Sequence, residues 1–254
     1  MPMERVVTVP KNAMDAALQI VEEGEGRDVM LRLLGGLAFK LTCPTASVEK
    51  YRRENKDIDL VGRKSDSGKV SRLMEELGYK PREMFNRLSM GQRLIYYDMA
   101  NRRRVDIFLD QFAMCHKFDF SDRLLPGLKT LPFTDLVMTK LQVVEITEKE
   151  FLDLIAAFAD HEVTKGEIDG ELIAEACAKD WGLYKTFSRN LDALSKRAQG
   201  LDEPLRDRVL SRIDTVNTLM ENEPKTLGWR VRARIGEKAR WYELPDSDSD
   251  AVFS

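Results

Sequence analysis

Asp57 and Asp59 are the residues of this sequence whose type and spacing most directly suggest chemistry. They stand two positions apart in the apolar stretch 56–61, a pattern typical of a β-strand. Alternate residues of a strand share a face, so the two carboxylates would lie together while Ile58 and Leu60 point into a core. Neighbouring carboxylates repel each other, and one takes up a proton unless a cation neutralises the pair. Mg²⁺ suits this place because it prefers oxygen ligands and usually brings phosphates with it.

The spacing alone is also compatible with a strand edge that carries two exposed acids. The same interval recurs at Asp246, Asp248 and Asp250, where serines separate the aspartates and no apolar residues frame them. That end of the chain is predicted to be disordered. The pair at 57 and 59 therefore needs a third residue before a metal site is indicated.

Asp106 supplies that third residue. It lies in the apolar run 104–110, which is predicted to be a strand returning from a hairpin turn. A site that holds two metal ions for phosphoryl transfer typically draws carboxylates from separate strands. The alternative is an exposed strand acid paired with Arg102 or Arg104. Asp110, at the exit of the same strand, is a weaker candidate on the same face.

The elements around these acids are predicted from hydrophobic spacing. Residues 29–34 form a buried strand, and Gly35-Gly36 opens a tight turn into a short helix over 37–41. Because glycine has no Cβ, the backbone of such a turn can approach a ligand, and N–H groups at a helix start favour an anionic phosphate. The simpler interpretation is a strand-to-helix turn without a ligand. The polar loop 42–56 then leads to the aspartate pair.

The second half of the chain has a different pattern. Helices are predicted from residue 131 and over 148–160, 167–179, 181–198 and 204–220, in addition to helices over 12–23 and 68–78 and a strand over 93–97 in the first half. We therefore expect an α/β fold, a mixed sheet flanked by helices, followed by a helical half. A boundary near Pro126 would separate an α/β domain of residues 1–126 from a helical domain of residues 127–254, which ends in a basic hairpin and the acidic tail.

Composition limits the classes of function. The 254 residues carry a formal net charge of −3, which excludes a globally basic nucleic-acid binder. The widely spaced Cys43, Cys115 and Cys177 are expected to be free thiols. No stretch has the pattern of a signal peptide or the length of a membrane span, so we expect a soluble, cytoplasmic protein. His116 and His161 are expected to serve core or surface packing.

A basic stretch near the end of the chain suggests a second kind of partner. Over 229–235 arginines alternate with apolar residues, so a strand there would have one basic and one apolar face. Trp241 and Tyr242 could stack on nucleic-acid bases. The alternative is a terminal hairpin whose basic face is simply solvated.

Gly35-Gly36 after a strand, the pair Asp57 and Asp59, and Asp106 together resemble the nucleotidyltransferase fold of the DNA polymerase β superfamily. Within that superfamily the sequence is similar to the bacterial AbiEii-type and related minimal nucleotidyltransferases. Those proteins pair an α/β core with a helical C-terminal half, which is the organisation expected here.

The resemblance covers residues 28–160 and includes a helical motif of the family, a lysine near a helix start and an aspartate some turns later. Lys140 and Asp153 match that motif. The sequence departs from the family in three places. The loop before Asp57 is longer than usual, Leu37 stands where many relatives have Ser or Thr, and acidic residues follow Lys140 where relatives are often rich in arginine.

The resemblance implies a role for each matched residue. The metal ligands would be Asp57, Asp59 and Asp106, and the nucleotide-binding residues would be Gly35, Gly36, Lys140 and Asp153. Asp106 would also orient or deprotonate the acceptor hydroxyl, and Lys140 would offer a charge to the triphosphate while Asp153 positions it. The alternatives are a helix-surface lysine at 140 and a purely structural aspartate at 153.

The family's activity is Mg²⁺-dependent transfer of a nucleoside monophosphate from an NTP to an acceptor hydroxyl. The acceptor stays open among a tRNA end, a protein side chain and a small molecule such as an aminoglycoside. Relatives of the AbiEii type can act as toxins that a separate antitoxin protein holds in check. Two alternatives remain, a degenerate relative that binds nucleotide without turnover and an RNA-binding module that uses residues 229–242.

Overall fold

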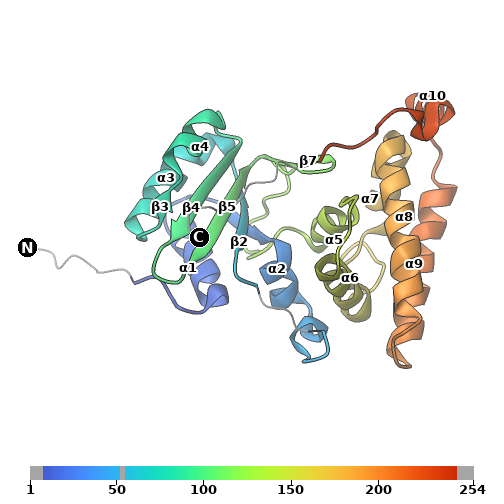
Figure 1. The fold of residues 1–254 in the computed structure, drawn as a ribbon, viewed down its shortest axis with the longest axis horizontal. Helices are drawn as coiled ribbons and strands as arrows, with labels where there is room; N and C mark the ends of the chain where they lie inside the picture. The colour runs from blue at the N-terminus through green and yellow to red at the C-terminus, as the bar shows by residue number, and fades with distance from the viewer. Residues whose placement is uncertain (1–7, 52–54, 245–254) are drawn as a thin grey trace, which may run out of the picture.

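The computed structural model describes residues 8–51 and 55–244, which contain a sheet-bearing half followed by a helical half (Figure 1). The helices of the first half are α1 (Ala13–Glu25), α2 (Gly35–Thr42), α3 (Ser67–Glu76) and α4 (Glu83–Leu88). Its strands are β1 (Leu31–Leu34), β2 (Ile58–Gly62), β3 (Lys80–Pro81), β4 (Arg93–Asp98), β5 (Arg103–Leu109), β6 (Gln111–Ala113) and β7 (Lys117–Asp119). The helices that follow are α5 (Phe133–Leu141), α6 (Glu148–Asp160), α7 (Gly170–Lys179), α8 (Trp181–Ala198), α9 (Leu205–Asn222) and α10 (Leu227–Ile235).

Five strands form one mixed sheet in the order β1-β2-β5-β4-β3. The pair β2–β5 is parallel, and the pairs β1–β2, β5–β4 and β4–β3 are antiparallel. Strands β6 and β7 form a separate hairpin beside the sheet. The expected α/β fold with a mixed sheet and a helical second half is thus confirmed.

Local sequence explains where the first elements begin and end. The side chain of Asn12 accepts hydrogen bonds from Met14 N and Asp15 N, so Asn12 is the N-cap of α1. The helix extends two residues beyond the predicted 12–23 and includes Gly24. A Cβ on Gly24 would lie 2.8 Å from the carbonyl oxygen of Val29, so this glycine lets the chain entering β1 pass close to the helix.

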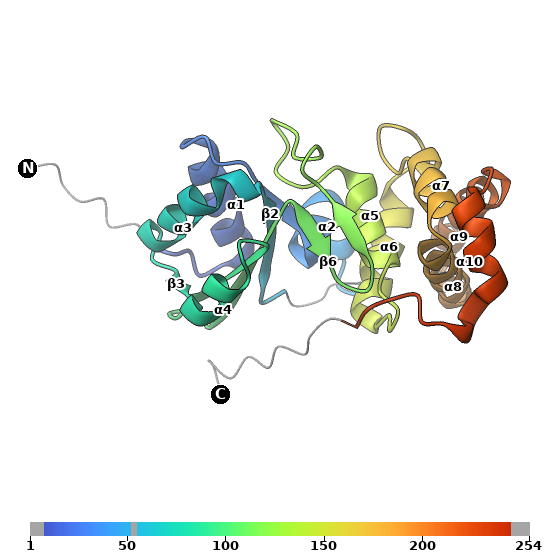
Figure 2. The ribbon, with the colours of Figure 1, turned by 90° about the horizontal axis from the view of Figure 1, so that it is seen from above.

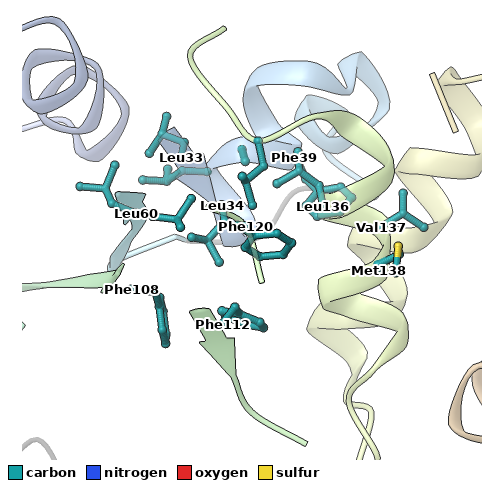
Figure 3. Packing of buried hydrophobic residues seen from close by; sticks show 14 of the residues in the cluster. Leu33, Leu34, Phe39, Leu60, Phe108, Phe112, Phe120, Leu136, Val137 and Met138 are labelled. Carbon is teal, nitrogen blue, oxygen red and sulfur yellow. The ribbon is translucent and has the colours of Figure 1, made fainter. Parts of the chain in front are cut away.

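The sheet and the helical half share one hydrophobic core. Figure 3 shows side chains of β1, α2, β2, β5, β6 and α5 packed together, among them Leu34, Phe39, Leu60, Phe108 and Leu136. Residues 129–131 run alongside β1, because Leu33 N donates to Lys129 O and Leu131 N donates to Leu33 O. The chain beyond Pro126 therefore first completes the sheet edge and then enters α5. The domain boundary near Pro126 stays a prediction.

Helix α5 is buried along almost its whole length, from Thr134 to Leu141. It packs against α2, α6, α7 and α8, and both views place α5 and α6 between the sheet and the long helices α8 and α9 (Figures 1 and 2). A helix enclosed in this way holds its side chains in fixed positions. Lys140, in the last turn of α5, is one of them.

The predicted strand and hairpin over 229–242 are wrong. Residues 227–235 form helix α10, whose start is capped by the hydroxyl of Thr226, which accepts from Trp229 N. The alternation of arginine and apolar residues fits a strand, but tertiary contacts favour the helix. The Trp229 ring packs edge-on against Tyr184 at 5.4 Å, and the Arg232 guanidinium lies 4.7 Å from the centroid of the Trp181 ring.

Other short elements were not predicted, namely β3, α4 and the β6–β7 hairpin. Each is too short for a hydrophobic period to stand out. The acidic end at Asp246, Asp248 and Asp250 lies outside the described residues. Within the described residues, none of the helices has both the length and the apolar character required to cross a bilayer.

Candidate functional site

The mixed sheet places Asp59 and Asp106 side by side. They are direct partners in the parallel β2–β5 register, so both side chains leave the same face of the sheet. Asp57 comes one residue before β2 and is exposed, whereas Asp59 is half-buried. Ile58 and Leu60 are fully buried on the opposite face, as predicted.

Gly35 is required by its contact with Asp59. The β1–α2 turn holds Gly35 at φ +67°, a conformation that L side chains rarely adopt. A Cβ at this position would lie 2.1 Å from Asp59 Oδ2. The aspartate therefore occupies the space that a side chain at residue 35 would need.

Lys140 is held by two carboxylates of α6. Its Nζ lies 2.9 Å from Asp153 Oδ2 and 3.7 Å from Glu150 Oε1, and it sits 5.9 Å from the centroid of the Phe39 ring of α2. The side chain is buried, so the alternative of a helix-surface lysine is wrong. Asp153 is buried directly behind it.

Residues from both halves of the chain line a pocket of about 480 Å³. Six of the lining residues carry a carboxylate or an ammonium group, and the full lining is Gly36, Asn55, Lys56, Asp57, Asp59, Lys140, Lys149 and Glu150. Four of the seven predicted site residues thus meet in one cavity, with Gly35 against Asp59 and Asp153 behind Lys140. A larger hollow of about 550 Å³ runs along α1, and none of the predicted site residues lines it.

The ionised form of Asp59 is disfavoured in this pocket. Burial, together with the charges of Asp106 and Asp57, raises the pKa of Asp59 to about 7, against the opposing effect of Lys140 and Arg93. A cation bound between the aspartates would favour their ionised forms. The donor set of Asp57 and Asp59 therefore fits a hard divalent metal such as Mg²⁺.

Asp106 is engaged in a different way. Its Oδ1 accepts from Arg93 Nε at 2.8 Å, and its Oδ2 lies 2.8 Å from Arg104 Nε. Strand geometry brings these groups together, since Arg104 shares a face with Asp106 on β5 and Arg93 lies opposite Phe108 on β4. Arg104 was considered as a partner of an exposed Asp106, but the carboxylate is buried, and Arg93 was missed.

The three-carboxylate metal site is only partly assembled in this arrangement. Among the described residues, no group of three or more His, Cys, Asp and Glu side chains is placed to hold one ion. Asp57 and Asp59 fit a metal ion, whereas both oxygens of Asp106 face guanidinium groups. Arg93 and Arg104 therefore compete with a metal ion for the oxygens of Asp106.

Sequence reasoning missed four residues that line the pocket, Asn55, Lys56, Lys149 and Glu150. Lys56 directly precedes Asp57 in the sequence, and this position beside the aspartate pair could have identified it as a site residue. Lys149 and Glu150 belong to the segment after Lys140 that departs from the arginine-rich family pattern. Leu37, another departure, is buried in the core and does not line the pocket.

The cysteines and histidines, whose side chains could also do chemistry, serve packing in this structure. Cys43, Cys115 and Cys177 are free and buried, as expected. His161 stacks on Phe133 with ring centroids 3.7 Å apart, and His116 Nε2 lies 2.8 Å from Thr186 Oγ1. These contacts agree with the packing role expected for both histidines.

Trp241, one of the residues predicted to stack on bases, is committed to contacts within the protein. Its Nε1 donates to Thr186 Oγ1 at 3.2 Å, and its ring packs edge-on against Trp181 and Tyr242. The Arg189 guanidinium lies 5.1 Å from the centroid of the Trp241 ring. Trp241 thus packs the segment that follows α10 against α8.

The chain has only distant similarity to known proteins. No protein-family model matches the sequence, and no curated protein matches it. Among solved structures it is similar to the lincosamide antibiotic adenylyltransferase LnuA bound to lincomycin, with a TM-score of 0.30 and 20% identity over 41% of this chain and 66% of LnuA. The chain thus spans about two thirds of the length of that protein.

Two further structures are similar over more of the chain. The antibiotic-resistance factor ANT(2'')-Ia has a TM-score of 0.35 and 10% identity over 82% of this chain and 94% of its own. JHP933 from Helicobacter pylori has a TM-score of 0.33 and 13% identity over 87% of this chain and 92% of its own. All three TM-scores lie below 0.5, so the function has to be argued from the side chains in the pocket.

Proposed function

We propose that the protein is a Mg²⁺-dependent nucleotidyltransferase that moves a nucleoside monophosphate from an NTP to an acceptor hydroxyl. The observation that carries this proposal is the pocket in which Asp57 and Asp59 lie beside Lys140 and Gly36. Carboxylates for a metal, an ammonium group and a glycine turn at a helix start form a combination suited to a triphosphate.

The chain's own residues suggest how the transfer would proceed. The N–H groups of the Gly35-Gly36 turn would hold phosphate oxygens, and Lys140, positioned by Asp153, would add positive charge. Mg²⁺ held by Asp57 and Asp59 would neutralise the triphosphate oxygens. With those charges matched, the phosphates can bind in a place where the aspartates alone would repel them.

The bond changes follow from the chemistry of phosphoryl transfer. The acceptor oxygen forms a bond to the α-phosphorus, the bond from that phosphorus to the β-bridging oxygen breaks, and pyrophosphate leaves. The acceptor proton passes to a carboxylate, for which Asp106 is the candidate beside Asp59. Movement of Arg93 or Arg104 away from Asp106 would make it a stronger base.

Transfer can be measured directly. The protein is incubated with each α-³²P-labelled NTP and Mg²⁺, with or without tRNA, total bacterial protein or an aminoglycoside. We expect label to appear on one acceptor class with the wild type and to vanish with Asp57→Asn and Asp59→Asn. Asp192→Asn, which removes an exposed carboxylate of α8, should transfer normally. Unchanged transfer by Asp57→Asn would exclude the catalytic role.

The family's toxin activity can be tested in the same terms. Induced expression of the wild type in bacteria should slow growth, and expression of Asp57→Asn should not. A growth arrest that both proteins cause would not derive from nucleotidyl transfer. An antitoxin partner is proposed only if the arrest depends on Asp57.

A second candidate function is nucleotide binding without turnover, and the ion pairs of Asp106 favour it. Arg93 and Arg104 compete for the oxygens of Asp106, so this carboxylate is a weaker metal ligand and a weaker base while both arginines stay in place. Calorimetry would then find Mg²⁺-dependent NTP binding while no acceptor in the panel receives label. Label transfer by the wild type would exclude this second candidate and support nucleotidyl transfer.

A further inference from the structure

We infer that Lys149 recognises the terminal phosphates of the nucleoside triphosphate, with Lys56 lining the same pocket from the sheet half of the chain. This inference rests on the proposed function, and it makes Lys149 the residue that distinguishes a triphosphate from a shorter phosphate chain. Three lysines and three carboxylates line the pocket, and they come from segments far apart in the sequence.

Lys140 alone is poorly suited to neutralise a triphosphate. Its ammonium group already faces Asp153 at 2.9 Å and Glu150 at 3.7 Å. The positive charge is therefore matched within the protein before any ligand arrives. Lys140 can position a phosphate, but the remaining charge of the polyphosphate needs other cations.

Lys149 has the properties that Lys140 lacks. It is exposed, it lines the pocket, and within residues 8–51 and 55–244 it forms no ion pair. Its place in the first turn of α6 is unfavourable for a cation, because the helix dipole is positive at that end. A lysine in such an unfavourable position, with no carboxylate to pair with it, is expected where a bound anion supplies the missing charge.

A capping box orders the start of α6 and therefore the backbone that carries Lys149. Thr147 and Glu150 form a capping box in which Thr147 N donates to Glu150 Oε2 at 3.1 Å. Glu150 also faces Lys140, so the same residue fixes both lysines relative to each other. The backbone of Lys149 is thereby tied to the pocket that contains Asp57 and Asp59.

The charge balance predicts discrimination by phosphate number. The lysines and carboxylates of the pocket wall offset each other, and a divalent cation at Asp57 and Asp59 makes the pocket positive. A triphosphate carries charge that reaches beyond the metal ligands, whereas a monophosphate does not. Lys149 should therefore matter for the triphosphate and hardly at all for the monophosphate.

The test compares the affinities of NTP, NDP and NMP with the same base, measured by calorimetry in Mg²⁺. The variants are Lys149→Gln, Lys149→Arg and Lys56→Gln, with Lys165→Gln as matched control. Lys165 is an exposed lysine of the helical half that pairs with Glu171 outside the pocket. We expect Lys149→Gln to weaken NTP binding about tenfold and NMP binding less than twofold, the tenfold loss corresponding to about 1.4 kcal/mol.

Lys149→Arg should keep most of the affinity because the charge remains, and Lys165→Gln should equal the wild type. Equal losses for NTP and NMP in Lys149→Gln, or no loss for either, would overturn the inference while leaving the proposed function standing. Absence of NTP binding by the wild type would remove both. Circular dichroism should be identical for all variants, since the exposed side chain of Lys149 supports no packing.

Discussion

At the scale of single residues, Gly35 has the most demanding position in the site. Its backbone lies at φ +67°, and the space beside its Cα is filled by the Asp59 carboxylate. Neither requirement alone would be decisive, since glycine is only one of several residues found in turns. Together they leave no alternative side chain.

Gly35→Ala should therefore lower the free energy of unfolding by about 2 kcal/mol or more and abolish nucleotide binding. Left-handed backbone costs an L residue about 1–2 kcal/mol, and displacing Asp59 adds to this. Urea unfolding and calorimetry measure the two effects. Gly127→Ala is the control, because Gly127 has φ +79° and open space around its Cα. If Gly35→Ala is no less stable than Gly127→Ala, the Asp59 side chain can move aside at little cost and the prediction is wrong.

The two arginines of Asp106 differ in burial, which predicts different costs of removing them. The side chain of Arg104 is 8% exposed and that of Arg93 is 27% exposed. Arg104→Gln should cost about 3 kcal/mol of stability, because it leaves a buried carboxylate short of a partner. Arg93→Gln should cost about 1 kcal/mol. Urea titrations give both values.

The double variant Arg104→Gln/Asp106→Asn serves as the control for that comparison. Removing the charge of Asp106 as well should restore part of the lost stability, since an amide tolerates burial better than an unpaired carboxylate. A double variant less stable than Arg104→Gln would assign the cost to lost packing of the arginine stem.

His116 predicts a pH dependence of stability. Burial lowers the pKa of His116 below its ordinary value of 6.5, so the unfolded chain binds the proton more readily than the folded one. Its contribution is intact above pH 6.5 and is lost as the pH falls, at up to about 1.4 kcal/mol per pH unit. Between pH 7.5 and 5.5 the wild type should therefore lose more stability than His116→Gln. Equal slopes in urea titrations of the two proteins would contradict this.

At the scale of elements, helix α6 connects stability with the site. Its capping box orders the turn that carries Lys149 and Glu150, and its next turn carries Asp153. The helix itself was predicted with its observed bounds, because its apolar period is strong. Its contact with Lys140 of α5 could not be read from either segment alone.

Thr147→Ala should lower stability by about 1 kcal/mol and weaken NTP binding, because the cap and the orientation of Glu150 are lost together. Asn12→Ala removes the cap of α1 at a similar cost, but α1 does not line the pocket of the site. We therefore expect unchanged NTP affinity in Asn12→Ala by calorimetry. Equal affinity losses in the two variants would indicate a general loss of stability instead of a local effect on the site.

At the scale of the whole molecule, the two halves share a core that runs from Ala16 to Met220. The three tryptophans, Trp181, Trp229 and Trp241, all lie in the helical half, so their fluorescence reports on that half. Far-UV circular dichroism reports on both halves. Because residues 129–131 pair with β1, we expect the two signals to give coincident urea transitions. Two separate midpoints would instead establish a folding boundary near Pro126.

The sequence by itself determined the local features of this protein. Strand period predicted that Asp57 and Asp59 share one face, and helix period located α6, α7, α8 and α9. These signals are carried by neighbours in the chain, so they survive without knowledge of the fold. The same reasoning failed at α10, where a two-residue alternation suggested a strand and contacts with Trp181 and Tyr184 decided for a helix.

Only the tertiary structure decided which charges meet. The parallel register sets Asp106 beside Asp59, while the adjacent antiparallel strand brings Arg93 to Asp106, and the packing of α5 and α6 on α2 buries Lys140 between Asp153 and Glu150. Electrostatic energy depends on distance through space and on burial, and neither follows from separation along the chain. The sequence could therefore supply the candidate groups for chemistry, but the fold alone determined their partners.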